Sequence, residues 1–337
     1  MERLLPALVV HITSRLILFL FLSWAVLYAF LGFDVLTVVV WGFILSTCVL
    51  FVELLIGPGL VSSLLRPRWI ERGSDIVLWS LVEGEAEKAG VRQWRVGVLD
   101  YNAPNALAVS SFTGRPTIIL TRGLLINLTY RQVRAVVAHL MGCSKSGFLG
   151  FSTALSGLLA LSNRAAKGYI KSYLEGRSPG LVNVIFAGWS YLYFALTYTQ
   201  ASIASRGMSV YGDDFCILQT KDPESLFYAI LKVAAGISSE PLGPMRKDCI
   251  PLKGLMFQDP ASALRDSSAV KEAADRYEID LTRLIGQYSE YKEGYGPKLH
   301  IFERFWVQPN LASRLEHVLE FGSEAGSPLK IGLNLKR

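Results

Sequence analysis

Two uncharged apolar runs near the amino-terminal end limit the possible folds most strongly. They cover Leu16–Phe33 and Val35–Val52, and only Asp34 separates them. Each run approaches the roughly 20 apolar residues that a helix needs to cross a bilayer. Because 51% of the chain is hydrophobic, 18% is charged and the mean hydropathy is +0.34, we expect membrane segments plus a globular part. The two runs predict a transmembrane helical hairpin.

The charges beside these runs predict their orientation. Arg3 and Arg15 precede the hairpin and Arg66, Arg68 and Arg72 follow it, whereas its tip carries no Lys or Arg. The positive-inside rule then places both ends in the cytoplasm. We therefore expect a multi-pass protein of the cell membrane with its soluble domain on the cytoplasmic side.

Two further apolar stretches, Gly147–Leu161 and Leu181–Ala201, interrupt the soluble part. The second is long enough to span a bilayer. The first is short and rich in Gly and Ser, so a re-entrant segment and a buried segment both stay open. The loop between them carries positive charges, at Arg164, Lys167, Lys171 and Arg177. These favour the cytoplasmic side and conflict with a simple second transmembrane hairpin.

The net charge and the cysteines argue against a nucleic-acid-binding protein and against a disulfide-stabilised protein. The formal charge is +6, but Lys and Arg are scattered without a basic tract, so no nucleic-acid partner is expected. The four cysteines are widely spaced and form no C-x-x-C pair. This pattern indicates no disulfide framework and a reducing setting for the soluble part.

Local patterns predict a mixed domain of helices and a small sheet. Helical periodicity covers residues 74–90, and short strands are expected at Val96–Leu99, Ala106–Phe112 and Thr117–Leu120. The last two strands flank Thr113-Gly114-Arg115-Pro116, a turn sequence that predicts a hairpin. Thr129-Tyr130-Arg131-Gln132 then reads as a capping box that opens an amphipathic helix.

His139-Leu140-Met141-Gly142-Cys143, on that helix, resembles the zinc-binding pattern H-E-x-x-H. In that pattern two histidines on one helical face hold zinc and the glutamate is the general base. Here Leu140 stands in the glutamate position and Cys143 in the second histidine position. His139 and Cys143 are four residues apart, so both are expected to face one point.

The chain as a whole resembles the HtpX-type membrane metallopeptidases, the group that also includes the CAAX prenyl peptidases. The resemblance covers roughly residues 75–320, in order. Its motifs are Pro104-Asn105-Ala106-Leu107-Ala108 (family P-N-A-F-A), Thr121-Arg122-Gly123-Leu124-Leu125 (T-x-G-L-L), Arg134–His139 (x-A-V-x-A-H), Ser205-Arg206 with Asp213 (S-R-x-x-E-x-x-A-D), and Gln308-Pro309 with Ser313-Arg314-Leu315 (H-P and E-R-I).

The departures from the family pattern lie at the chemistry. The alignment of motifs puts Ser209 in place of the glutamate that ligates zinc, and Gln308 in place of a histidine. The four core positions of the family site are two histidines, the base and the ligand glutamate. Three of them have changed here, to Leu140, Cys143 and Ser209. No catalytic residue is therefore expected to be intact.

The alternative is a zinc site made of His139, Cys143 and Asp213. If that site is absent, no cofactor is expected. A cysteine peptidase built on Cys143 would need an oriented imidazole, which His139 on the same helix does not readily provide.

The resemblance also implies a peptide-binding edge strand. In HtpX-like enzymes the strand that corresponds to Ala106–Phe112 would accept an extended substrate by strand addition, with contacts from Asn105, Ala106, Leu107 and Ala108. It suggests, in addition, a structural ion pair between Asp213 and Arg314.

These observations predict an α+β fold: a mostly helical, gluzincin-like metallopeptidase domain with a small β-sheet, plus transmembrane helices. We expect a hairpin at 1–57, the first part of the domain at 58–145, two apolar helices at 146–204 and a helical second part at 205–337. The expected function is a membrane-anchored pseudopeptidase that binds or scaffolds membrane or unfolded proteins in quality control, as a possible homo- or hetero-oligomer. The alternatives are an active metalloendopeptidase with the altered metal site, and a structural subunit of a membrane assembly.

Overall fold

A computed structural model describes residues 12–13, 16–17, 32–111, 115–176, 181–239, 245, 249–260 and 311–327. Its helices are α2 (Val35–Leu65), α3 (Ile76–Lys88), α4 (Arg122–Asn127), α5 (Tyr130–Lys145), α6 (Leu149–Leu174), α7 (Leu181–Thr220), α8 (Pro223–Ser239), the 3₁₀ helix η2 (Ile250–Leu255) and α13 (Leu311–Glu324). The strands are β1 (Arg68–Trp69), β2 (Arg95–Leu99), β3 (Ala106–Val109) and β4 (Thr117–Thr121). The domain is therefore mostly helical, of the α+β type, as expected.

The four strands form one mixed sheet in the order β1-β2-β4-β3. The central pair, β2 and β4, is parallel, while β1 and β3 are antiparallel to their neighbours at the two edges. The antiparallel pairing of β3 with β4 confirms the expected hairpin, although its turn at 112–114 lies outside the described residues. The strands are nearly continuous in buried apolar residues, which is typical of a sheet covered by helices.

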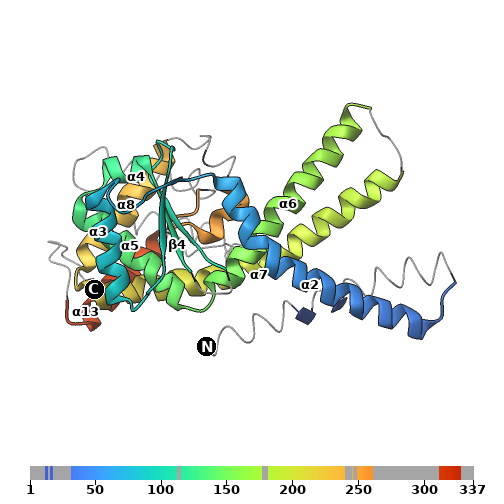
Figure 1. Cartoon of the computed structure of the whole chain (residues 1–337), viewed down its shortest axis with the longest axis horizontal. Coiled ribbons are helices and arrows are strands. Elements are labelled where there is room, and N and C mark those ends of the chain that lie inside the picture. Colours follow the sequence, from blue (N-terminus) through green and yellow to red (C-terminus); the bar gives the residue numbers. More distant parts are fainter. Residues whose placement is uncertain are drawn as a thin grey trace, which may run out of the picture.

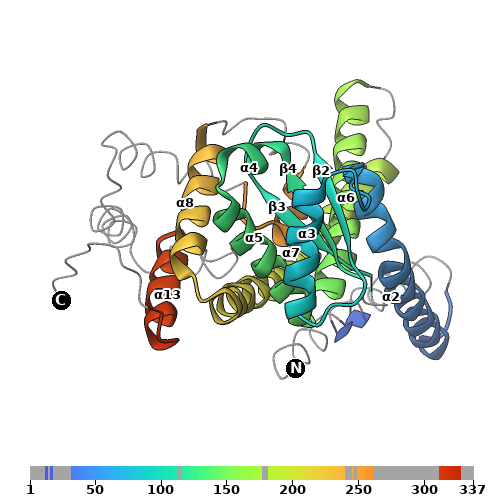
Figure 2. The ribbon, with the colours of Figure 1, turned by 60° about the vertical axis from the view of Figure 1, so that its left-hand side comes forward.

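Helix α5 is the centre of the domain (Figure 2). It packs against α3, α7, α8 and β3, and its residues from Val133 to Cys143 are almost all buried. The expected capping box is present, since the amide of Thr129 donates to Oε1 of Gln132 at 3.0 Å. A helix buried on most of its sides fits the apolar run that surrounds His139.

Helices α2, α6 and α7 extend away from the sheet (Figure 1). Close packing of α2 on α6 depends on small residues, because a Cβ added to Gly157 would lie 2.3 Å from the carbonyl oxygen of Gly57. The stretch 147–161, left open above, belongs to a helix whose residues from Leu149 to Ala160 are mostly buried. Helix α7 runs unbroken across position 204, where the sequence suggested a boundary between parts of the chain.

Two of the stretches in which the sequence predicts membrane spans are helical in the structure. Within the ranges that the structure describes, no helix combines the length and the apolar composition needed to cross a membrane. The stretches Val35–Val52 and Leu181–Ala201, where spans were expected, are parts of the longer helices α2 and α7, which continue into the packed domain. The span expected at Leu16–Phe33 lies almost entirely outside the described residues.

Candidate functional site

The candidate site lies where α5 crosses α7, and the crossing is very close. A Cβ added to Gly212 of α7 would lie 2.8 Å from Sγ of Cys143 and 2.8 Å from Cε1 of His139. One added to Gly142 of α5 would lie 2.6 Å from Cβ of Phe215. Because both positions are glycine, the backbone of Gly212 packs directly on His139 and Cys143, and the backbone of Gly142 packs on Phe215. His139 and Cys143 therefore face α7 directly, with no room for a methyl group between them and the Gly212 backbone.

His139, Cys143 and Asp213, the residues of the alternative metal site, lie close together in the structure. Nδ1 of His139 lies 2.8 Å from Oδ1 of Asp213, and Nε2 lies 3.4 Å from Sγ of Cys143. The first contact is short, but its direction is poor for a hydrogen bond. All three residues are at most 2% exposed, so the cluster is closed off from solvent.

Arg314 of α13 completes this cluster. Its Nε and one terminal nitrogen donate to the two carboxylate oxygens of Asp213, each at 2.8 Å. The other terminal nitrogen donates to the backbone oxygen of Phe257 at 2.5 Å and to Oε1 of Gln258 at 3.2 Å. The expected pair of Asp213 and Arg314 is confirmed, in the bidentate geometry that gives the strongest form of such a pair.

Phe257 covers the cluster from a third direction. Its ring meets the His139 ring edge-on at a centroid distance of 5.0 Å, and the Arg314 guanidinium lies 4.7 Å from its centroid. Phe257 is fully buried. The charged pair is thus packed between an aromatic ring and two helices, which excludes water from it.

The electrostatics follow from this burial. Burial lowers the pKa of His139, and Asp213 opposes that shift only in part. Burial also raises the pKa of the Cys143 thiol, and the Asp213 carboxylate raises it further. Burial alone would raise the pKa of Asp213, but Arg314 and then His139 outweigh it and hold this pKa well below its usual value. At neutral pH the cluster therefore contains an ionised carboxylate paired with a guanidinium, a neutral imidazole and a neutral thiol.

These residues do not fit a zinc ion. A catalytic zinc needs about three protein ligands and an open position for water. Among the residues that the structure describes, no group of three His, Cys, Asp or Glu side chains is placed to hold a metal ion. Arg314 engages both oxygens of Asp213, the ligand form of a cysteine is the thiolate and not the thiol of Cys143, and a buried guanidinium repels a cation.

The other positions that the sequence singled out carry no acid–base group at the cluster. Leu140 is 1% exposed and belongs to the apolar core. Ser209 lies one turn before Asp213 on α7, and its buried Oγ has no hydrogen-bond partner among the described residues. Gln308 lies outside the described residues. Neither Leu140 nor Ser209 therefore supplies a general base for a water molecule.

The predicted peptide-binding edge is covered by the chain itself. Met256 forms an antiparallel bridge with Leu107, and the amide of Phe257 donates to the backbone oxygen of Ala106 at 2.7 Å. Asn105 fixes this contact, because its Nδ2 donates to the backbone oxygen of Gln258 at 2.8 Å. Asn105, Ala106, Leu107 and Ala108 are all fully buried. The edge expected to take a substrate therefore holds residues 256–258 instead.

Sequence reasoning missed two features of this site. One is the close approach at Gly212, for which the sequence offers no signal beyond a glycine inside a helix. The other is the role of Phe257 and Gln258. The short apolar run 255–257, followed closely by Pro260, is the pattern of a buried strand at a sheet edge, and could have indicated it.

Comparison with known proteins finds a family match that covers the elements building this site. The model of peptidase family M48 matches residues 77–320, which include α5, α7 and most of α13. The protease HtpX homolog of Tropheryma whipplei (strain Twist) is 27% identical over 171 residues, 49% of this chain and 59% of that protein. The protease HtpX homolog of Aeropyrum pernix is 27% identical over 214 residues, 59% of this chain and 64% of that protein. The chain thus matches about three fifths of the length of these relatives. No solved structure matches significantly.

Proposed function

Because the chain belongs to peptidase family M48, we propose that it is a member without proteolytic activity, whose former zinc site has become part of the structural core. The observation that carries this proposal is the bidentate grip of Arg314 on both oxygens of Asp213, beside His139 and Cys143. It uses the polar groups of the cluster for packing and leaves no position for water. Leu140 in place of a general base points the same way.

The role that remains is binding. We place the protein at a membrane, where it binds or scaffolds membrane or unfolded proteins in quality control. The support for membrane attachment is α2, which exposes large apolar side chains, among them Leu36, Phe43 and Leu55 at 74%, 60% and 72%. Surfaces of this kind mark contact with a membrane or a protein. The relatives named as proteases support a role close to protein turnover.

Metal content and cleavage test the loss of activity together. We expect purified protein to contain no stoichiometric zinc by elemental analysis and to leave a reduced, alkylated unfolded protein uncut, even after zinc is added. Since His139 is proposed to be structural, His139→Ala should change neither readout, although it should lower stability. Stoichiometric zinc together with cleavage, both lost in His139→Ala, would overturn the proposal in favour of an active metalloendopeptidase.

Hydrogen exchange tests the binding role and its place. If an unfolded protein adds to β3, it must displace residues 256–258, which now bond to Ala106 and Asn105. We therefore expect amides 256–258 to exchange faster when a reduced, alkylated unfolded protein is present, while those of the central strand β2 stay protected. Binding without faster exchange would move the binding surface elsewhere. No binding at all would leave the structural-subunit interpretation.

A further inference from the structure

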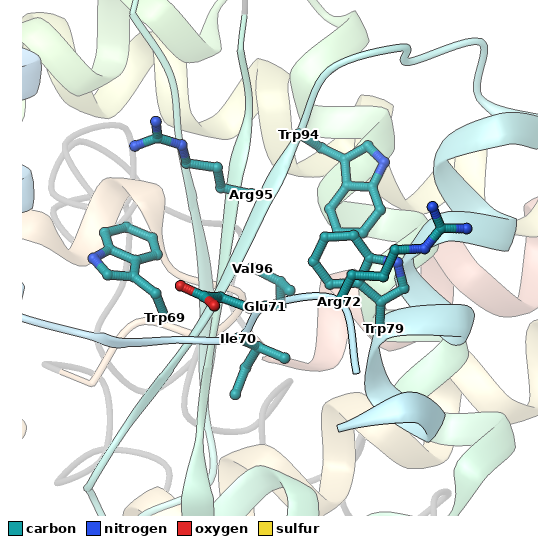
Figure 3. A pocket seen from close by; sticks show the side chains of 8 residues that line it. All are labelled: Trp69, Ile70, Glu71, Arg72, Trp79, Trp94, Arg95 and Val96. Atoms are coloured by element: carbon teal, nitrogen blue, oxygen red, sulfur yellow. The ribbon is translucent and has the colours of Figure 1, made fainter. Parts of the chain in front are cut away.

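A pocket of about 430 Å³ lies beside the edge strand β1, at the edge of the sheet opposite to β3. Figure 3 shows Trp69 on one wall and Trp94 with Trp79 on the other, with Ile70 and Val96 between them. The rings of Trp79 and Trp94 pack with centroids 4.6 Å apart. Both the volume and the lining, in which five of the eight residues are aromatic or aliphatic, are typical of a small-molecule site. Nothing in the candidate active site uses these residues.

The charges at this pocket favour an anion. Arg72 and Arg95 line it, on the sides of Trp79 and Trp69 respectively, and Glu71 is the only acidic residue of the eight that line it (Figure 3). Both arginines are exposed, and neither guanidinium has an ion pair or hydrogen bond among the described residues. Arginine forks match phosphate oxygens, and unpaired arginines beside aromatic rings are typical of phosphate recognition.

The loop that forms one wall is held in place before any ligand arrives. Ser74 Oγ donates to the backbone oxygen of Glu71 at 2.9 Å, and the amide of Glu71 donates back to Ser74 Oγ at 3.1 Å. The amide of Ile70 donates to the backbone oxygen of Val96 at 3.0 Å, which fixes β1 on β2. A preformed pocket binds without the cost of ordering its walls.

The position of the pocket selects the kind of anion. It begins four residues after the end of α2, and α2 exposes an almost continuous apolar surface, with Val35, Leu36, Val39, Val40, Trp41, Phe43, Ile44, Leu45, Phe51, Val52, Leu55 and Ile56 all exposed. Tryptophan and arginine next to such a helix are the residues that settle at the headgroup level of a bilayer. A ligand with a phosphate and an apolar part matches the pocket and its surroundings together.

We infer that this pocket binds the headgroup of an anionic phospholipid, with the phosphate at Arg72 or Arg95 and the glycerol region between Trp69 and Trp94. The site is separate from the cluster at Asp213. It rests on the membrane attachment proposed above only for the source of the lipid, because the pocket itself can be tested with soluble lipid.

The test compares vesicles of phosphatidylcholine with vesicles that also contain phosphatidylglycerol, and measures binding by flotation. The readout is the preference for the anionic vesicles. We expect Arg72→Gln with Arg95→Gln to lower this preference by roughly 20- to 30-fold, about fivefold for each arginine, and Trp69→Ala to lower it as well. Short-chain phosphatidylglycerol, used as monomers, should bind the unaltered protein saturably and the double variant weakly.

Two matched variants separate the pocket from general effects. Arg131→Gln removes one positive charge, as Arg72→Gln or Arg95→Gln alone does, from an exposed position of α5 and should leave the preference unchanged. Trp41→Ala removes an exposed tryptophan of α2, 54% exposed against 44% for Trp69, and should weaken binding to both kinds of vesicle equally. Circular dichroism confirms that each variant is folded.

Four results would overturn the inference. An unchanged preference in the double variant, or an equal loss in Arg131→Gln, would leave only diffuse electrostatic attraction. Inorganic phosphate that competes as well as the lipid monomers would indicate a site for free anions. An acidic peptide that displaces the monomers and binds more tightly than they do would assign the pocket to a protein partner. If no vesicle binds but the monomers do, membrane attachment fails and the pocket stands.

Discussion

Replacing Arg314 with methionine should lower the free energy of unfolding by about 3–5 kcal/mol, the cost of removing one partner of a buried ion pair. The change leaves Asp213 ionised at 1% exposure with only a poorly aligned contact to His139. It also frees the backbone oxygen of Phe257, to which Arg314 donates. Urea unfolding measures the effect, with the slope of the transition checked for constancy.

A double-mutant cycle separates the ion pair from the loss of packing. Asp213→Asn with Arg314→Met removes both charges, so the double variant should lose less stability than the sum of the single variants, by about 1–3 kcal/mol. Arg314→Lys keeps the charge without the fork, and should fall between the unaltered protein and Arg314→Met. Arg131→Gln, at an exposed position, should stay within about 0.5 kcal/mol. Additive losses in the double variant would show that Arg314 acts through packing alone.

Patterns of short range identified much of the fold and of the cluster. The short apolar runs placed β2 and β4 to within a residue, and the capping box at Thr129 placed the start of α5. The spacing of His139 and Cys143 put both on one helical face, and the family motif brought Asp213 and Arg314 to them. Helical and strand periods are local properties, so sequence alone carries them.

Such local patterns do not predict contacts between segments that are far apart in the chain. Asn105 and Gln258 are 153 positions apart in the chain, and their hydrogen bond depends on how η2 and the segment after it pack on the sheet. The covering of β3 by residues 256–258 therefore could not be derived from the strand pattern of Ala106–Val109 alone. Apolar runs were likewise ambiguous, because a buried helix such as the first part of α6 has the composition of a membrane segment.

Replacing Gly212 with alanine should also lower the free energy of unfolding, because it fills the space at the α5–α7 crossing. In Gly212→Ala the new methyl group would lie 2.8 Å from Sγ of Cys143 and 2.9 Å from Nδ1 of His139, closer than unstrained atoms approach. We expect a net loss of up to about 2 kcal/mol, since overpacking costs about 1–3 kcal/mol and the better helix propensity of alanine returns about 1 kcal/mol. Urea unfolding is again the measurement.

Gly207 provides a matched control on the same helix. An added Cβ there would meet only Phe148, at 3.8 Å and beyond, so Gly207→Ala should raise stability by about 0.5–1 kcal/mol through helix propensity alone. Cys143→Ala removes the sulfur of one of the two side chains that crowd Gly212, and the double variant with Gly212→Ala should therefore lose less stability than the two single changes together. If Gly212→Ala proved as stable as Gly207→Ala, the cluster would have free space for a methyl group, and with it space for a water molecule or an ion. The proposal that the site is a closed core rests on the opposite result, because a catalytic metal site must keep one position open beside its ligands.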